Sequence, residues 1–443
     1  MNRREFLAAV TASPLAGLPA IGGTVEHPMV EHRFDVVVAG GGPAGIAAAI
    51  TAARNGARVA LIELKGSLGG TWTSGVLSCM IGFDRTDLDR EITSRLRAMG
   101  ATQPRRPGAV ETYGANYLYE PEYLKLVLDD MVTEAGVEFR LHTMLVAVER
   151  RGRDIAAIIT ESKCGRERWV AKAFVDGTGD GDLGALADCG YETGDGLGGP
   201  DQPASLLCTV AIDESEALRR FIANDSANYS EKGELRRNAK KELLKELKRL
   251  GVEPTYQAPT LNRIHPGLFL LMANHQYGVR VDDSAGITRA TVQARKELFT
   301  LTDTLARKGG AEWKSMRLVH IAEQIGHRCA RRIHGRYRLT AADVAAGRTF
   351  ADSVATSRFG IDIHGTTFAA NVKLPAGTPG GVKFHPFQIP LRACQAVDVD
   401  NLYMGGRCIS GDFIPQASYR VTGTAIATGM AAGKAASARA VCA

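Results

Sequence analysis

The 443-residue sequence lacks three features that would each assign it to a simple class of protein. No uninterrupted apolar run approaches the roughly 20 residues that a membrane-spanning helix needs. The eight cysteines show no C-x-x-C and no regular spacing, which argues against a structural zinc site, a redox dithiol and a disulfide scaffold. The net charge of +6 is mild and spread along the chain, so nothing indicates a nucleic-acid partner.

Glycine is the residue that the chain has in excess. The 49 glycines are clustered, which indicates tight turns or close approach of the backbone to a ligand. The remaining composition, 45% hydrophobic and 23% charged, is that of an ordinary globular protein. The length allows two or three domains.

The N-terminal stretch NRREFL places Arg3 and Arg4 ahead of a weakly hydrophobic run over residues 8–21. This pattern resembles a twin-arginine export signal, and a frayed tail with two chance arginines is the alternative. We expect residues 1–25 to be a signal peptide. The twin-arginine export machinery is then a partner, and the protein is periplasmic or secreted.

A strand, a helix and a second strand are predicted from Phe34 onward. The apolar run FDVVVA predicts a strand buried on both faces, and IAAAITAARNG predicts a helix that Gly56 ends. The run ARVALIE predicts a second strand ending at Glu63. Because two strands joined in this way lie parallel, the pattern indicates a parallel sheet with helices on its faces.

Gly40, Gly42 and Gly45 lie between the first predicted strand and the helix with the spacing G-x-G-x-x-G. The first glycine allows a tight turn, the second allows close approach to a pyrophosphate, and the third lets helix and strand pack closely. The helix N-terminus offers N–H groups and a positive dipole to phosphates. Glu63 stands where an acid binds a ribose diol, so the unit predicts a dinucleotide without a 2′-phosphate.

This motif alone does not separate NAD from FAD, but further glycine-rich segments favour FAD. LGGTWTSG (68–75) follows the acid closely, and VDGTGDGD (175–182) and NLYMGGRCISGD (401–412) each include or follow a predicted strand. The last predicted helix begins near Arg420. Beyond residue 180, no G-x-G-x-x-G stands between a predicted strand and a predicted helix, so a separate NAD(P) domain is not expected.

The remaining pattern predicts helices and short strands in alternation. Helices are expected at 121–135, 214–249 and 288–307, a strand at 137–142, and a separate antiparallel meander at 145–150, 153–160 and 167–171. The predicted fold class is α/β: a Rossmann-like FAD-binding domain with a parallel sheet and a β-meander crossover, and an inserted α+β substrate domain. The predicted boundaries are 34–180 and 391–443 for the two parts of the FAD-binding domain and 181–390 for the substrate domain.

Several separate motifs resemble those of the FAD-dependent oxidoreductase family, in the broad glutathione-reductase-like flavoprotein superfamily. The resemblance runs from about residue 34 to residue 440. It is carried by VVVAGGGPAGIAAA, LGGTWTSG, VDGTGDGDLG, RRIHGRYRLTAADVAAGR, IDIHG, IPLR and NLYMGGRCIS…ASYRVTGTAIATGMAAG. It implies FAD as the cofactor and leaves the substrate open, because members of the family differ in function.

The resemblance also implies where the cofactor lies. The pyrophosphate is expected along Gly40, Gly42, Pro43, Ala44 and Gly45, the adenosine ribose at Glu63, and the adenine at the backbone of Val146. The ribityl chain and the flavin are expected along Gly69, Gly70, Thr71, Gly179, Asp180, Gly406 and Arg407. The pyrimidine ring is expected over Arg420, Thr422 and Gly423. A helix N-terminus under that ring stabilises negative charge at flavin N1.

The chain departs from the family pattern at two positions. Cys329 stands where the family tends to carry an acid, which puts any role of that acid in doubt. Leu391 stands where the family usually has Tyr, which predicts a changed substrate pocket.

Five residues are candidates for the reaction itself. His364 and His385 titrate near neutrality and are candidate acids or bases, with His364 preferred because it lies in the family-like IDIHG. Arg328 is a candidate for holding a carboxylate, since guanidinium presents a planar fork. Tyr419 and Arg420 precede the last helix, and Tyr419 is a candidate proton donor. The alternative for each is a structural side chain.

Two further groups carry weaker expectations. Arg331 and Arg332 are adjacent to Arg328 in the same segment, and strand alternation points these two to opposite faces. Cys79 and Cys408 lie near predicted flavin loops, where covalent flavin attachment is the alternative to a buried thiol.

These observations predict an FAD-dependent oxidoreductase that transfers a hydride between a small organic substrate and the flavin. Oxygen, a quinone or a cytochrome is the expected electron acceptor, because an exported protein does not meet the NAD(P)H pool. Neither a metal site nor a nucleic-acid partner is expected. The alternatives are an NAD(P)-dependent dehydrogenase, a flavoprotein without net redox turnover, and a non-catalytic exported binding protein.

Overall fold

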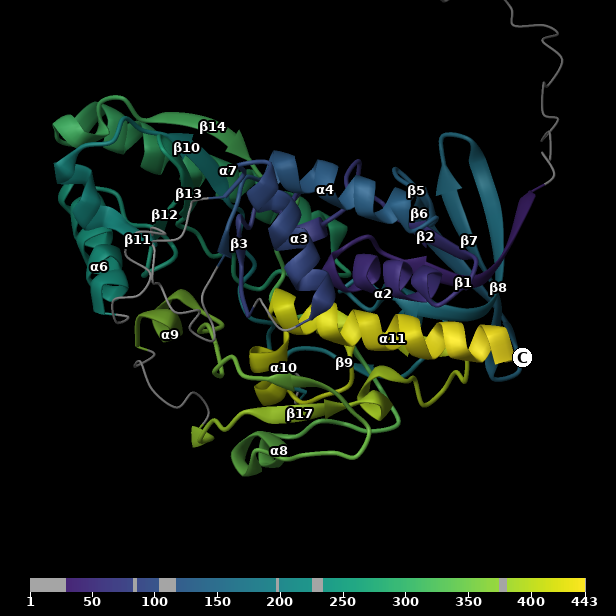
Figure 1. Ribbon diagram of the computed structural model, residues 1–443. Helices are drawn as coiled ribbons and strands as arrows, with labels where there is room; N and C mark the ends of the chain where they lie inside the picture. The colour runs from purple at the N-terminus through teal and green to yellow at the C-terminus, as the bar shows by residue number, and fades with distance from the viewer. Residues whose placement is uncertain are drawn as a thin grey trace, which may run out of the picture.

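The computed structural model describes residues 29–82, 86–102, 117–196, 199–224, 234–373 and 381–442. The predicted signal peptide lies outside these residues. The fold is mixed α/β, with two main sheets at opposite ends of the molecule in Figure 1. No helix in the described ranges is long and apolar enough to cross a membrane.

The first sheet has the strand order β5-β2-β1-β8-β7-β6, and β18 also pairs with β8. Its strands are β1 (Val30–Ala39), β2 (Val59–Ile62), β5 (Glu138–Arg140), β6 (Met144–Arg151), β7 (Asp154–Ser162), β8 (Gly165–Asp176) and β18 (Leu402–Met404). Strands β5, β2, β1, β8 and β18 are parallel to one another. Strand β7 pairs antiparallel with β8, and β6 pairs antiparallel with β7. The Val36, Val37 and Val38 side chains are fully buried, as expected of a strand covered on both faces.

The meander differs from the prediction in one respect. Its third strand does not stop before the apolar run AFVD, because β8 is one strand of 12 residues. It pairs antiparallel with β7 and parallel with β1. Neither glycine nor proline occurs between Arg166 and Asp176, so nothing in the sequence ends the strand. The meander is therefore a continuation of the parallel sheet.

One face of the first sheet is covered by helices. These are α2 (Pro43–Arg54), α3 (Asp87–Ala98), α4 (Pro121–Glu134) and α11 (Thr422–Cys442). The predicted helix at 121–135 is confirmed by α4, which buries Leu124, Val127, Leu128 and Met131 as expected. Helix α11 runs along α2 and over β8 (Figure 1), so the C-terminal end of the chain returns to the sheet that begins the fold.

Helices α2 and α11 approach each other without intervening side chains. A Cβ atom on Gly429 would lie 2.2 Å from the carbonyl oxygen of Ala44, and one on Gly433 would lie 2.2 Å from that of Ala48. Only glycine fits at such a distance, which no real Cβ contact shows. The small residues of the last helix are therefore required by its packing.

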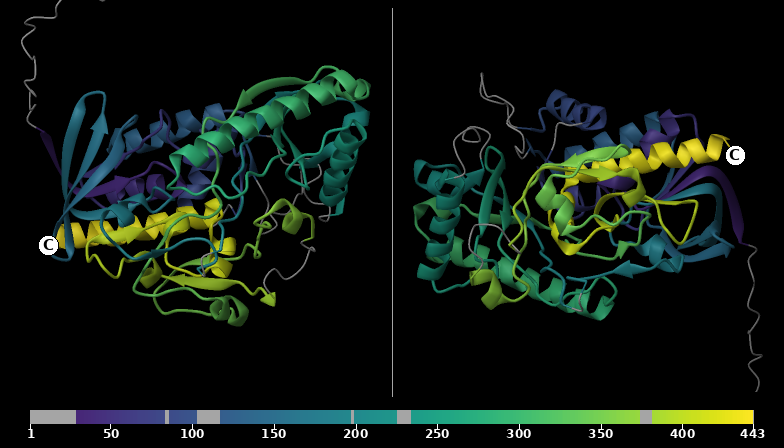
Figure 2. Two further views of the ribbon diagram at one scale, coloured as in Figure 1. Left: turned by 180° about the vertical axis from the view of Figure 1, so that it is seen from behind. Right: turned by 90° about the horizontal axis from the view of Figure 1, so that it is seen from below.

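The second sheet has the order β11-β12-β13-β10-β14. Its strands are β10 (Cys208–Ala211), β11 (Ile222–Asn224), β12 (Thr260–His265), β13 (Leu268–Met272) and β14 (Arg317–Ile321). Helix α6 (Glu234–Arg249) packs at one edge, and the long helix α7 (Ser284–Lys308) crosses the sheet on the side that faces the viewer in the left view of Figure 2. Helix α7 confirms the prediction at 288–307, and the Asp283 side chain caps its first turn.

The prediction of one helix over 214–249 is wrong. A short 3₁₀ turn at Glu216–Phe221 and strand β11 occupy part of it, and α6 covers Glu234–Arg249. Asn224 and Ile222 pair with β12, so sheet pairing overrides the local helical preference.

A third group of short elements covers the other face of the first sheet, at the bottom of Figure 1. It comprises α5 (Asp182–Leu186), β9 (Tyr191–Glu192), β15 (Arg332–Ile333), α8 (Ala341–Ala346), β16 (Ser353–Ser357), β17 (Phe387–Pro390) and α10 (Phe413–Tyr419). Two small elements, β3 (Cys79–Met80) and β4 (Tyr117–Leu118), pair near the second sheet, and α9 covers Phe368–Lys373. The predicted α/β fold class is thus confirmed.

Replacing Gly429 by Val tests the helix contact. We expect the free energy of unfolding to fall by about 1–3 kcal/mol or more, because the added methyl groups meet the α2 backbone rather than a movable side chain. Urea unfolding of the purified protein measures this. Ala438→Val, on an exposed site of the same helix, is the matched control and should change stability by less than about 0.5 kcal/mol. Equal stabilities of the two variants would contradict the contact.

Candidate functional site

The β1–α2 turn is fixed by the protein's own packing at two of its three motif glycines. Gly40 has a φ of +91°, and a Cβ on Gly45 would lie 1.7 Å from the Gly40 carbonyl oxygen. Gly42 is different, because its φ is −76° and the nearest atom to an added Cβ, the Gly177 carbonyl oxygen, is 3.8 Å away. Nothing in the protein requires glycine there. Pro43 begins α2, and no side chain caps the helix.

Glu63 and the second glycine-rich loop lie against this turn. The carboxylate of Glu63 accepts hydrogen bonds from the Gly41 N–H at 2.6 Å and from the Lys65 N–H at 2.7 Å. Burial raises the pKa of Glu63, and these backbone donors oppose the rise. Gly69 donates its N–H to the Gly41 carbonyl oxygen at 2.8 Å, so the loop at 69–71 is tied directly to the turn.

Two more predicted cofactor residues meet at the ends of β8 and β18. Arg407 forms an ion pair with Asp180 at 2.5 Å. A Cβ on Gly179 would lie 2.9 Å from the Arg407 guanidinium, and one on Gly406, whose φ is +81°, would lie 3.2 Å from Cβ of Ala44. Segments far apart in the sequence therefore converge beside the start of α2.

The residues described so far, from Glu63 past Gly42 to Arg407, are called the cofactor track. The remaining predicted cofactor residues lie at its two ends. Val146 is the bulged residue of β6, since the pairing with β7 passes from Leu145 to Ala147. At the other end, Thr422 and Gly423 begin α11. Thr422 Oγ1 accepts the N–H of Ile81 at 3.3 Å, and the Gly423 N–H donates to the Ile81 carbonyl oxygen at 2.9 Å.

The track fits a dinucleotide. Among the described residues, Arg407 Nε, Arg420 Nε and Thr424 Oγ1 are buried donors without a hydrogen-bond partner. A buried polar atom is costly when it is left unpaired, so these atoms indicate a polar ligand. The uncapped N-terminus of α2 and the open space at Gly42 suit a pyrophosphate.

A polar cluster lies beside the start of α11. Arg420 donates to the Asp362 carboxylate at 2.9 Å and to the Asp362 carbonyl oxygen at 2.7 Å. The same carboxylate lies 3.3 Å from Nε2 of His364. His364 is also held through its backbone N–H, which donates to the Gln202 side chain at 2.9 Å. The pair of Asp362 and His364 is thus held by Arg420 at one residue and by Gln202 at the other.

Arg328 and Cys329 form the next part of the cluster. Arg328 Nη1 donates to the Pro203 carbonyl oxygen at 2.6 Å and to Ser205 Oγ at 2.9 Å. Cys329 Sγ lies 3.4 Å from Gln202 Nε2 and 3.7 Å from Gln416 Oε1. Burial raises the pKa of the Cys329 thiol, so it is neutral where the family tends to carry an acid.

Three aromatic rings complete the cluster. The ring centroid of His275 lies 4.9 Å from that of His364, edge to face, and 4.2 Å from that of Tyr256. Tyr256 lies 5.8 Å from His364. Burial, followed by the charge of Arg328, holds the pKa of His275 far below its ordinary value, so this ring is neutral.

The charges around His364 set its protonation. Burial and then the positive charge of Arg328 lower the pKa of His364 to about 4, against an opposing hydrogen bond to Asp362. The pKa of Asp362 is itself well below its ordinary value: burial alone would raise it, but His364 and Arg420 outweigh that effect. At neutral pH the pair is therefore a neutral imidazole and a carboxylate.

Two candidate residues do not join this cluster. Tyr419 is fully buried, and its hydroxyl donates to the Ile409 carbonyl oxygen at 2.9 Å. His385 lies beside α8, where its backbone N–H donates to the Val344 carbonyl oxygen. Their catalytic roles remain untested predictions.

The two other arginines and the two cysteines that the sequence singled out lie outside the cluster around His364. Arg331 pairs with Asp182 at 2.7 Å, and the buried Arg332 donates to the Gly411 carbonyl oxygen at 2.8 Å. Cys79 and Cys408 are free, buried thiols. Burial raises the pKa of both.

Sequence reasoning missed several members of the cluster. Gln202, Tyr256 and His275 belong to stretches without a recognisable motif, and only the fold brings them to His364. Asp362 had a signal, since it lies two residues before His364 in IDIHG.

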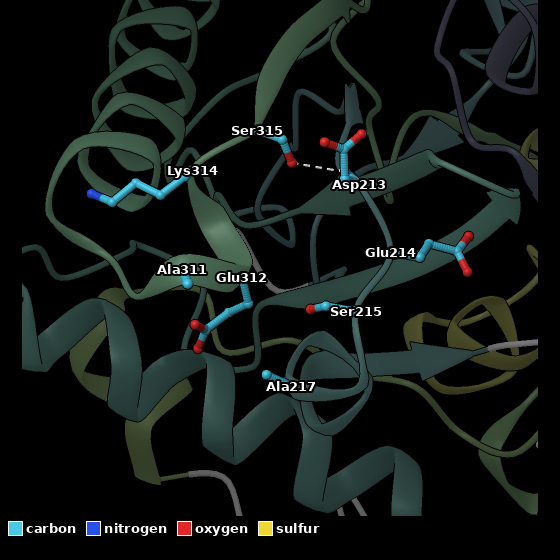
Figure 3. A pocket seen from close by; sticks show the side chains of 8 residues that line it. All are labelled: Asp213, Glu214, Ser215, Ala217, Ala311, Glu312, Lys314 and Ser315. Atoms are coloured by element: carbon cyan, nitrogen blue, oxygen red, sulfur yellow. Dashed lines mark hydrogen bonds between the residues drawn. The ribbon is translucent and has the colours of Figure 1, made fainter.

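A hollow of about 330 Å³ lies apart from this site, at the edge of the second sheet (Figure 3). It is lined by Asp213, Glu214, Ser215, Ala217, Ala311, Glu312, Lys314 and Ser315. It shares no residue with the cofactor track or the cluster. No group of three His, Cys, Asp or Glu side chains in the described part of the chain is placed to hold a metal ion.

The parallel sheet, the glycine turn and the track of orphaned donors define a dinucleotide-binding enzyme fold. The family model for FAD-dependent oxidoreductases matches residues 35–441, so the chain belongs to this family. FAD is therefore its cofactor.

Curated relatives are similar only over short segments. One segment is 58% identical over 45 residues to the soluble pyridine nucleotide transhydrogenase of Hahella chejuensis (strain KCTC 2396), which is 10% of each chain. Another is 32% identical over 124 residues to the sarcosine oxidase subunit alpha of Corynebacterium sp. (strain U-96), 27% of this chain and 13% of that one. These matches thus span a small fraction of either relative.

Solved structures resemble the chain over most of its length but at low identity. A geranylgeranyl bacteriochlorophyll reductase-like protein from Thermoplasma acidophilum is 11% identical, with 92% of this chain and 79% of that chain covered and a TM-score of 0.46. A flavin-dependent brominase is 14% identical, with 93% and 80% covered and a TM-score of 0.48.

Gly42→Val tests the cofactor track. A Cβ at this position is 3.8 Å from the nearest protein atom, and the Val side chain fills the space at the start of α2, so we expect FAD affinity to fall by at least about tenfold, a loss of about 1.4 kcal/mol. Flavin absorbance per protein and FAD titration of the apoprotein measure this. Unfolding of the apoprotein is the control and should show a loss of no more than about 1 kcal/mol, the cost of Val in place of Gly at the N-cap of α2. Unaltered FAD affinity would contradict the placement.

Proposed function

We propose that this enzyme oxidises a small organic substrate at a C–H bond next to an O–H or N–H group, with His364 as the proton acceptor. The observation that carries the proposal is the pair of Asp362 and His364 beside the start of α11, where the flavin ring is expected. A neutral imidazole next to an ionised carboxylate is the arrangement of an oriented general base.

The orientation of His364 follows from its contacts. The Asp362 carboxylate lies 3.3 Å from Nε2, which favours the neutral tautomer with its proton on Nε2 and its lone pair on Nδ1. Arg420 donates to the same oxygen of the Asp362 carboxylate, Oδ2, at 2.9 Å. The pair is accessible, because 42% of the Asp362 side-chain surface and 14% of that of His364 are exposed. The substrate proton is taken up at Nδ1.

The flavin and the protein divide the chemistry. When bound, FAD accepts the hydride and its two electrons from the substrate and later passes the electrons to an acceptor. The protein orients the substrate, keeps His364 neutral through Arg328, and supplies the helix N-terminus of α11 beneath the ring. Tyr256 and His275 form an aromatic wall beside the base.

The location and the electron acceptor are part of the proposal. The arginine pair at residues 3 and 4 supports export by the twin-arginine machinery in a folded, FAD-loaded form. Oxygen, a quinone or a cytochrome then reoxidises the enzyme. The glycine turn and the β-meander support a place in the glutathione-reductase-like flavoprotein superfamily.

His364→Gln tests the base. We expect the rate of flavin reduction by substrate under anaerobic conditions to fall by about 10²–10⁴-fold, because the acceptor of the substrate proton is lost. His320→Gln, on an exposed site of β14, is the matched control and should leave the rate unchanged. His385→Gln tests the other histidine candidate. A rate loss at His385 and none at His364 would overturn the assignment.

The pH profile supplies a second test of His364. The base works only when neutral, and its pKa is about 4, so kcat/KM should be constant from pH 7 to about 5 and fall tenfold per unit below about 4. As a control for acid unfolding, enzyme that has been held at low pH is returned to pH 7 and assayed there, where it should have regained its full rate. If kcat/KM of His364→Gln fell in the same way below about pH 4, the titration would belong to another group.

Replacing Arg3 and Arg4 with Lys tests the location. We expect the protein to stay in the cytoplasm with FAD bound, since the export signal needs the arginine pair and folding does not. Cell fractionation with flavin fluorescence measures both. An unchanged distribution between fractions would refute export by this route and leave the assignment of the flavin enzyme intact.

A further inference from the structure

Positive charge exceeds negative charge around the Asp362–His364 pair. Asp362 is engaged by Arg420 at 2.9 Å, so these two charges offset each other. Arg328 and Lys240 also face this region. Neither forms an ion pair with a carboxylate among the described residues, and Asp362 acts on both only at longer range. His364 and His275 are neutral and supply no negative charge.

The two uncompensated cations are poorly hydrated. Burial, followed by the charge of Arg420, lowers the pKa of Arg328 to about 10. Burial, followed by the charge of Arg236, lowers the pKa of Lys240 to about 8. Placing unpaired cations in such surroundings is costly unless an anion joins them. The region therefore favours a negatively charged ligand.

The hydrogen bonds of Arg328 indicate the shape of that anion. Both bonds to described residues use Nη1, towards the Pro203 carbonyl oxygen and Ser205. The remaining edge of the guanidinium consists of Nε and Nη2, whose parallel N–H groups match the two oxygens of a carboxylate. Ser205 and Pro203 hold the guanidinium at its far end, so this edge is presented in a fixed direction.

Lys240 approaches from another element. It lies on α6, next to the second sheet, whereas Arg328 follows β14. The charges that face it are Arg236 on its own helix, Asp362, and the Cys79 position on β3. Burial raises the pKa of the Cys79 thiol to about 12, so that group is neutral. Lys240 thus adds a second point charge on the side of α6.

We propose that the substrate of this enzyme carries a carboxylate, which binds to the Nε and Nη2 edge of Arg328 and to Lys240, beside the base His364. This inference rests on the proposed function, because it names the substrate class of the same site. The carboxylate fixes the substrate at one end, and the C–H bond to be oxidised lies between that end and His364. A substrate in which acid and oxidised carbon are close together suits this arrangement.

Binding of simple acids and their amides to the oxidised, FAD-loaded enzyme tests the proposal. The probes are acetate with acetamide, and benzoate with benzamide, followed by the perturbation of flavin absorbance. We expect at least one acid to bind ten times more tightly than its amide. Lys240→Met should weaken binding of that acid about tenfold and leave its amide unchanged. The matched control, Lys245→Met on an exposed site of α6, should alter neither.

The pH dependence separates a direct role of Lys240 from a structural one. The acid should bind less tightly as the pH rises through about 8, because Lys240 then loses its proton. Arg236, Asp362, Arg328 and Cys79 are the other charged or titratable groups that face it or the acid. This step should disappear in Lys240→Met, whereas a merely structural role would leave it in place.

Three results would overturn the proposal. They are equal affinity for each acid and its amide, unchanged acid binding in Lys240→Met, and tighter binding of inorganic phosphate than of every acid. None of these results changes the outcome of the rate measurement on His364→Gln, which tests the proposed function separately. Loss of the His364 effect with acid binding intact would instead refute the proton acceptor and leave the anion site in place.

Discussion

Helices α2 and α11 meet backbone to backbone, with Gly429 and Gly433 of one lying against the carbonyl oxygens of Ala44 and Ala48 of the other. This contact joins the glycine turn at the beginning of the fold to the last helix of the chain. It places the start of α11 at the end of the track that runs from Gly42 past Arg407. Arg420, immediately before that helix, then reaches Asp362. The position of the Asp362–His364 pair thus depends on a contact between two helices that lies away from the pair.

The charges around Asp362 and His364 set the protonation states of these two side chains. Burial, followed by the charge of Arg328, lowers the pKa of His364, whereas His364 and Arg420 together hold the pKa of Asp362 below its ordinary value against the effect of burial. Two effects oppose each other at a single histidine: Asp362 favours its protonated form, whereas burial and Arg328 disfavour it. An anion that binds to Arg328 weakens the second effect and raises the pKa of His364. Under the proposed function, an acid bound at Arg328 therefore makes His364 a stronger base, which couples recognition of the acid to removal of the proton.

The sequence allowed the first half of this account to be predicted, because local rules govern it. The turn at Gly40, Gly42 and Gly45 and the helices α4 and α7 follow from spacing and periodicity alone. The cluster around His364 does not, because Gln202, Tyr256 and His275 are brought together only by the second sheet and the loops around it. Lys240 was missed for another reason: in a helix rich in Lys and Glu, nothing in the sequence separates a half-buried lysine from its exposed neighbours. Strand pairing, which is non-local, also explains the errors at β8 and β11.

The most direct test of the central claim is a crystal structure of the FAD-loaded enzyme. The account predicts that the pyrophosphate lies at Gly42 and the start of α2, and that the reactive face of the flavin ring opens onto His364 and Arg328. A flavin ring that faces away from this cluster, with another pair of titratable side chains at its reactive face, would contradict it.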